Sequence, residues 1–177
     1  FYNCQKLQYL DDLSGWDMRK VNDMGFMFES CYVISEIKGI DEWKFENLEK
    51  MGWLFEGCYA LIELDLSGWD VSKVQTFNTM FASHNQNKGD MQLKKVNLSG
   101  WNPISATNMG SMFYGCGNLT ELDLSGWNMP KLTNVSHMMA DCFKLVSVDL
   151  TGWQTPSLTC LDAMFNDCRS LKMVDMS

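Results

Sequence analysis

The chain has 177 residues, of which 46% are hydrophobic and 20% charged, a composition typical of a folded domain. Its net charge of −8 argues against a surface that binds phosphates, so we expect no nucleic-acid partner. No run of about 18 apolar residues is present, so the sequence predicts no membrane-spanning segment in this stretch.

A repeat of about 26 residues runs through the whole chain. It is marked by tryptophans 27, 26, 32, 26 and 26 residues apart: Trp16, Trp43, Trp69, Trp101, Trp127 and Trp153. A second column runs in phase with it: Phe1, Phe28, Phe55, Phe81, Phe113, Met139 and Phe165. The sequence therefore predicts a single array over residues 1–177, with partial repeats at both ends and an inserted loop at about 82–95.

Each repeat contains the same expected elements in the same order. The phrases at 64–69, 96–101, 122–127 and 148–153 alternate apolar and polar residues, which predicts a short strand. A Gly before the Trp predicts a tight turn, and Glu42 occupies that column once. Apolar residues then recur at every third position, which predicts a 3-10 or single helical turn, at 74–81, 106–113 and 158–165.

A single repeat has one apolar side and cannot bury it alone, so the repeats must stack in register. We expect an α/β parallel solenoid of about six 26-residue units. One short β-strand per unit forms one face, and turns or short 3-10 or α-helical pieces form the other.

The sequence motif of the repeat resembles that of a known family. The unit "LxxLDLSGWDxSxVxxMxxMFxGCxxL", seen most fully at 112–135, is similar to the repeat of BspA-like leucine-rich repeat surface proteins. The resemblance covers essentially the whole chain. It implies a leucine-rich-repeat fold, an extracellular or cell-surface location, and a role in adhesion or host contact.

The cysteines and histidines are predicted to have structural roles, without catalysis or metal binding. The cysteine column, three residues after the Phe column, is interpreted as a ladder of small buried hydrophobes, because side chains on equivalent rungs point in parallel and do not face each other. Cys58, His84 and Cys116 lack a fourth ligand and a chelate spacing, so no metal site is predicted. Neither His84 nor His137 has a nucleophile or carboxylate at a recognisable spacing, so we expect no catalytic residue, no cofactor and no enzyme activity.

Two kinds of column are candidates for partner binding. Asp65, Asp123 and Asp149 recur on the strand face, where they either attract a basic partner or bond the turn amides. Aromatic residues form two further columns, either an exposed patch that grips a protein or glycan, or side chains packed against a flanking unit. The aromatic candidates are Phe26, Trp53, Tyr32 and Tyr59.

The inserted loop and three sequons complete the candidates. Loops that protrude from solenoids often carry contacts, so the basic pair Lys94 and Lys95 is a candidate, although a tolerated insertion is the alternative. Asn97, Asn118 and Asn134 stand in Asn-x-Ser/Thr sequons and are possible glycosylation sites.

Two functions are therefore predicted. The first is a non-enzymatic surface recognition or adhesion module that binds a protein or glycan partner. The alternative is a structural subunit that stacks end to end with further copies in an extracellular fibre or surface layer, because neither end has a polar capping unit.

Overall fold

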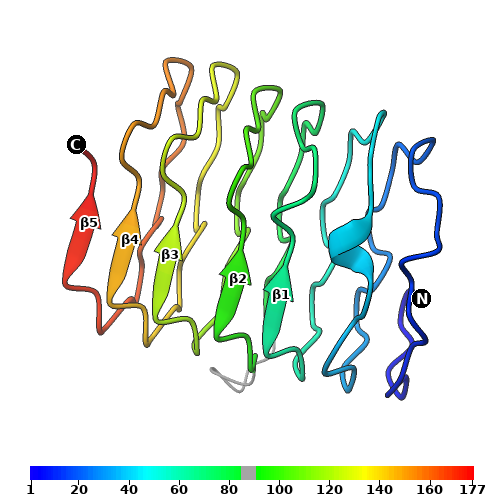
Figure 1. The fold of residues 1–177 in the computed structure, drawn as a ribbon. Helices are drawn as coiled ribbons and strands as arrows, with labels where there is room; N and C mark the ends of the chain where they lie inside the picture. Colours follow the sequence, from blue (N-terminus) through cyan, green and yellow to red (C-terminus); the bar gives the residue numbers. More distant parts are fainter. Residues whose placement is uncertain (85–90) are drawn as a thin grey trace.

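The computed structural model describes residues 1–84 and 91–177. The chain winds into successive coils that bond to one another in parallel, and the stack places the two termini at opposite ends (Figure 1). Within the described residues the regular elements are one 3-10 helix and five strands of three residues each, with no α-helix. They are η1 (Ile40–Glu42), β1 (Glu63–Asp65), β2 (Lys95–Asn97), β3 (Glu121–Asp123), β4 (Ser147–Asp149) and β5 (Met173–Asp175).

The short strands form because alternate side chains point into the core and out to solvent. The central residues Leu64, Leu122 and Val148 are buried, whereas the residues on either side are more exposed. All pairings are parallel, in the orders β1–β2 and β3–β4–β5. The prediction of short parallel strands is thus confirmed for the coils from residue 63 onward.

The segments with an apolar residue at every third position form turns, not helices. In 74–81, the amides of Phe77, Thr79 and Phe81 donate to carbonyls of the next coil at 3.0, 3.0 and 2.8 Å. The intervening amide of Met80 donates to the carbonyl of Phe77 within the turn, at 3.2 Å. In a helix, each of these amides would donate to a carbonyl of the same segment. The hydrogen bonds to the next coil therefore exclude a helix here.

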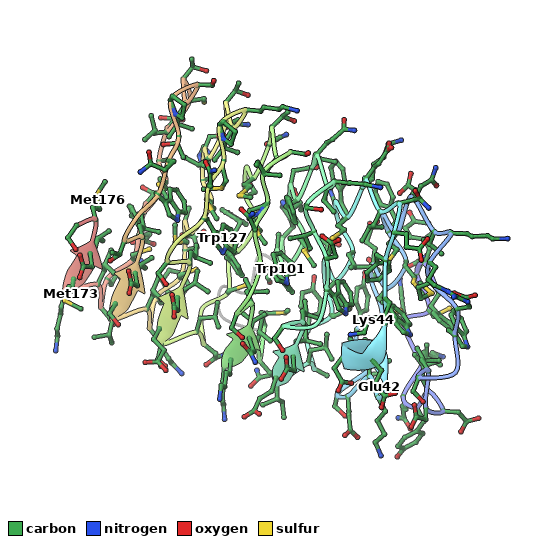
Figure 2. All side chains as sticks on the ribbon, turned by 45° about the horizontal axis from the view of Figure 1, so that its top comes forward. Glu42, Lys44, Trp101, Trp127, Met173 and Met176 are labelled. Atoms are coloured by element: carbon green, nitrogen blue, oxygen red, sulfur yellow. The ribbon has the colours of Figure 1, made fainter. Side chains whose placement is uncertain are left out.

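The one 3-10 helix lies at the corner where Glu42 interrupts the glycine column. Gly39, with φ of +79°, precedes this helix and takes the left-handed backbone conformation. The corner of this coil is therefore reshaped, and Figure 2 shows Glu42 in the short helix and Lys44 close to it.

Aromatic ladders fill the interior of the stack. Phe55 lies between Phe28 and Phe81, with ring centroids 5.6 and 5.7 Å apart and nearly parallel planes. Trp43 and Trp69 stack at 5.9 Å, and their indole N–H groups donate to backbone carbonyls one coil earlier at 2.9 and 2.7 Å. Trp101 and Trp127, in later coils, stack on each other with centroids 6.0 Å apart (Figure 2). Away from the ends of the stack, where Phe1 and Trp16 are exposed, both marker columns of the repeat therefore belong to the core.

The interior cysteines form a third ladder. Cys58, Cys116 and Cys142 are buried, and each thiol donates to a backbone carbonyl one coil earlier at 3.1–3.2 Å. All seven cysteines are free. Burial raises the pKa of the Cys58 and Cys142 thiols well above the ordinary value, so these groups stay protonated. The interpretation as a ladder of small buried side chains is confirmed for Cys31, Cys58, Cys116 and Cys142, whereas Cys4 is exposed and Cys168 is half-buried.

The regular repeat resumes earlier than the sequence suggested. Met91 and Leu93 are fully buried, and the amides of Gln92 and Lys94 donate to the carbonyls of Tyr59 and Ile62 in the preceding coil. The stretch from residue 91 to 95 therefore belongs to the array and not to an inserted loop. Residues 85–90 of the predicted loop lie outside the described residues.

Candidate functional site: a groove on the strand face

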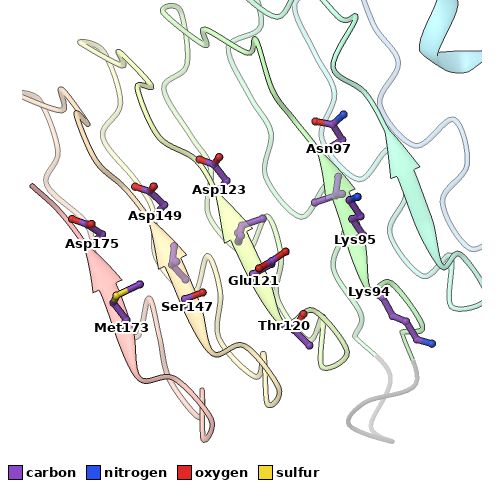
Figure 3. A pocket seen from close by; sticks show the side chains of 13 residues that line it. Lys94, Lys95, Asn97, Thr120, Glu121, Asp123, Ser147, Asp149, Met173 and Asp175 are labelled. Atoms are coloured by element: carbon purple, nitrogen blue, oxygen red, sulfur yellow. The ribbon is translucent and has the colours of Figure 1, made fainter.

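A groove of about 710 Å³ runs across strands β2 to β5. Figure 3 shows side chains of all four strands, and of the residues just before them, around this hollow. Its polar lining residues are Lys94, Lys95, Asn97, Thr120, Glu121, Asp123, Ser147, Asp149 and Asp175. The structure therefore brings together the basic pair and two of the three predicted aspartates.

The strand ladder is interrupted inside this groove. β2 and β3 belong to separate sheets, and Figure 1 shows them farther apart than their neighbours. At the other junctions the amides of Leu66, Leu124 and Leu150 donate to the next strand at 2.8–2.9 Å. The equivalent amide of Leu98 has no backbone partner among the described residues.

The second bond of this junction is missing as well. The amides of Lys94, Val146 and Lys172 donate to the carbonyls of the preceding coil at 2.8–2.9 Å, but the equivalent amide of Thr120 has no such partner in the described chain. We call this open junction between β2 and β3 the seam, defined by Leu98 and Thr120. Open strand edges are templates for pairing with another chain.

The seam is confined to the strand face. Trp101 and Trp127, one on each side of it, still stack with centroids 6.0 Å apart. On the turn side, the amide of Phe81 still bonds across the same two coils at 2.8 Å. The coils are therefore held together behind a locally open sheet.

Charge is divided unevenly across the groove. Lys94 and Lys95 lie at the β2 side, whereas Asp123, Asp149 and Asp175 follow one another on β3, β4 and β5 (Figure 3). Strands in a sheet are about 4.8 Å apart, so these carboxylates form a closely spaced row. The groove therefore presents a positive end and a negative end to a ligand.

The aspartates of this column also have a structural role. Asp65 and Asp123 each accept a hydrogen bond from the amide two residues on, at 3.0 and 2.9 Å, and this bond lowers the pKa of both carboxyls. Asp149 bonds its turn in the same way at 2.8 Å. This geometry supports the structural interpretation, and contact with a partner stays a prediction. Asp65 lies outside the groove residues.

The aromatic candidates lie elsewhere. Phe26 and Trp53 stack at 4.9 Å with planes 9° apart, and Tyr32 and Tyr59 stack at 5.2 Å. None of the four lines the groove. The predicted candidates thus divide into two separate surfaces.

All three predicted sequon asparagines use their side-chain amide in the fold. The Nδ2 groups of Asn97, Asn118 and Asn134 donate at 3.1, 2.7 and 3.2 Å, to Asp65 Oδ2, a backbone carbonyl and Asn108 Oδ1. Glycosylation joins the sugar to this nitrogen and leaves it one hydrogen, so the sugar would have to fit beside each of these bonds. Their modification stays a prediction.

Sequence reasoning missed part of the groove. Thr120, Glu121 and Ser147 line the groove and lie one or two positions before the buried Leu122 and Val148. The alternation of inward and outward residues in each strand could have indicated them. The open amides of the seam have no such signal, because backbone amides are present at every residue except proline. Among the described residues, no group of three or more His, Cys, Asp or Glu could hold a metal ion. The described part of the chain also contains no helix long and apolar enough to cross a membrane.

These features define a parallel stacked-repeat protein with a polar groove across its strands. The chain belongs to the family described as "Mycoplasma protein of unknown function, DUF285", which matches residues 1–97 and again 85–175. The two matches together span nearly the whole chain, as expected for an array of repeats. No curated protein and no solved structure matches the sequence.

Proposed function

We propose that the chain is a leucine-rich-repeat solenoid of the BspA-like kind, and that it is a non-enzymatic recognition module at the cell surface or outside the cell. The 26-residue period, the "LDLSGW" strands and the parallel stacking of coils support the solenoid. The location rests on the resemblance of the repeat.

The partner that fits the groove best is an extended segment of another protein. The observation that carries this proposal is the seam, because the amides of Leu98 and Thr120 have no backbone partner among the described residues, and Thr120 lines a groove that carries both charge signs. An extended peptide satisfies such edges with its own main chain, and its side chains supply specificity. Lys94 and Lys95 select acidic side chains at one end, and the aspartate row selects basic ones at the other.

A protein partner is favoured over a glycan. Sugars are gripped on the open faces of aromatic rings, and the groove contains no aromatic residue. Phe26 and Trp53 stack with their faces against each other. Hydrogen bonds to open strand edges are the kind that a polypeptide makes.

Reversing the charge of the basic pair tests this proposal. We expect 12-residue peptides selected from a random displayed library on the wild-type protein to bind Lys94→Glu/Lys95→Glu about tenfold or more weakly, because like charges then face the acidic residues of the ligand. Fluorescence anisotropy with the labelled peptides measures this loss.

The matched control is Lys20→Glu/Lys131→Glu, which changes the net charge equally at exposed positions outside the groove. This variant should bind the same peptides as the wild type does. Failure to obtain any saturable peptide, or equal binding by both double variants, would contradict recognition through the groove.

A further inference from the structure

Two adjacent coils carry the same outward pattern of aromatic, acid and aromatic. Phe26, Glu29 and Tyr32 lie at intervals of three residues in one coil, and Trp53, Glu56 and Tyr59 repeat them in the next. The two rows are held side by side by the Phe26–Trp53 and Tyr32–Tyr59 stacks. We call these six residues the aromatic–acid array. None of them lines the groove on the strand face.

The fold does not require these residue types. Phe26 and Trp53 have φ of +62° and +58°, a conformation that is unusual for bulky side chains. Later coils place Thr79, Ser111 and Ala163 at this position with the same positive φ. The side chain of Phe26 remains 45% exposed. Phe26 is exposed and Trp53 is half-buried, and an aromatic stack that reaches the surface in this way indicates a binding surface.

Among the described residues, neither carboxylate of the array pairs with a lysine or an arginine. Glu29 Oε2 is buried and has no hydrogen-bond partner in the described structure. Burial, and then the charge of Glu56, raise the pKa of Glu29. The side chain of Glu56 is only 12% exposed, and its basic partner among the described residues is the ring of His84, whose Nδ1 lies 3.1 Å from Oε1. A buried charge without a partner is costly, and a ligand cation would remove that cost.

We propose that the aromatic–acid array binds an arginine side chain of a partner protein. The guanidinium group pairs with the carboxylates of Glu29 and Glu56 in the two-pronged geometry that suits this group. The methylene stem packs against the apolar ring edges. Arginine fits better than lysine because its head is planar and more weakly hydrated. This surface is separate from the groove, so its function does not depend on the proposal made for the groove.

The test uses the blocked tripeptide Gly-Arg-Gly, with Gly-citrulline-Gly as its uncharged isostere and Gly-Lys-Gly as its charged counterpart. In NMR titrations we expect the arginine peptide to shift the amides of Glu29, Tyr32, Glu56 and Tyr59 saturably. Both other peptides should bind about tenfold more weakly, because they lack the charge or the fork geometry.

Two double variants locate the site. Glu29→Gln/Glu56→Gln should weaken binding of the arginine peptide about tenfold or more, because it removes both charges and keeps the side-chain shape. Lys94→Glu/Lys95→Glu in the groove should leave it unchanged, which separates this site from the proposed function. The proposal would be overturned if the wild type bound the citrulline or the lysine peptide as tightly as the arginine peptide. It would also be overturned if the arginine peptide caused no saturable shift, or if Glu29→Gln/Glu56→Gln bound it as tightly as the wild type does.

Discussion

Phe55→Ala lowers the free energy of unfolding by about 3–5 kcal/mol, or the melting temperature by roughly 6–20 °C for a chain of this length. Phe55 is fully buried and stacks on both sides, against Phe28 and Phe81. Truncation leaves a cavity in the middle of the ladder, where two coils cannot close without moving the hydrogen bonds between them. Thermal and urea unfolding followed by circular dichroism measure the loss.

The matched control is Phe26→Ala, which removes the same ring from an exposed stack. Phe26 is 45% exposed; it stacks on Trp53 and has a looser, edge-on contact with Tyr2, with ring centroids 6.4 Å apart. We expect a loss of about 1 kcal/mol, the value of one stacked aromatic pair. Equal losses for the two variants would show that the phenylalanine ladder is not the core of the stack.

The second large effect is expected at Gly115. This residue and Gly126 both have φ of +72°, so a side chain at either costs about 1–2 kcal/mol for the left-handed backbone. A Cβ at Gly115 would also meet the carbonyl oxygen of Ser83 at 2.5 Å, whereas one at Gly126 meets nothing within 4 Å. Gly115→Ala should therefore lose about 1–3 kcal/mol more than Gly126→Ala does, because the neighbouring backbone must move.

Because both glycines have the same φ, the difference between the two variants measures the close approach of the two coils and not the backbone strain. Ser83 is buried, and its amide donates to the carbonyl of Tyr114 at 2.8 Å, so Ser83 cannot retreat without breaking that bond. Urea unfolding of both variants under the same conditions gives the difference. A Gly115→Ala variant as stable as Gly126→Ala would mean that these coils are farther apart than the structure places them.

The repeat period predicted most of the fold. Once Trp69 and Phe55 were recognised as members of columns, stacking in register followed, because equivalent residues of successive coils must meet. The period also indicated that the corner at Glu42 differs, and a 3-10 helix forms there. Spacing alone could not distinguish a helical turn at 74–81 from the observed turns, because both place every third residue on one side.

The functional surfaces were predicted only in part. The sequence identifies Lys94, Lys95 and the aspartates by residue type, but their meeting in one groove depends on how strands β2 to β5 lie side by side. The seam at Leu98 and Thr120 depends on the relative position of two strands, which no residue type encodes. The acids Glu29 and Glu56 were not predicted, because their column is acidic in only these two repeats and the repeat pattern does not single it out.

Hydrogen exchange at the seam tests recognition through the groove most directly. In the free protein, the amides of Leu98 and Thr120 should exchange faster than the bonded amides of Leu124 and Val146 at the next junction. A selected peptide at saturating concentration should slow exchange at Leu98 and Thr120 by about tenfold or more. The proposal would be contradicted if the Leu98 and Thr120 amides exchanged as slowly as those of Leu124 and Val146 in the free protein. It would also be contradicted if the bound peptide did not slow their exchange.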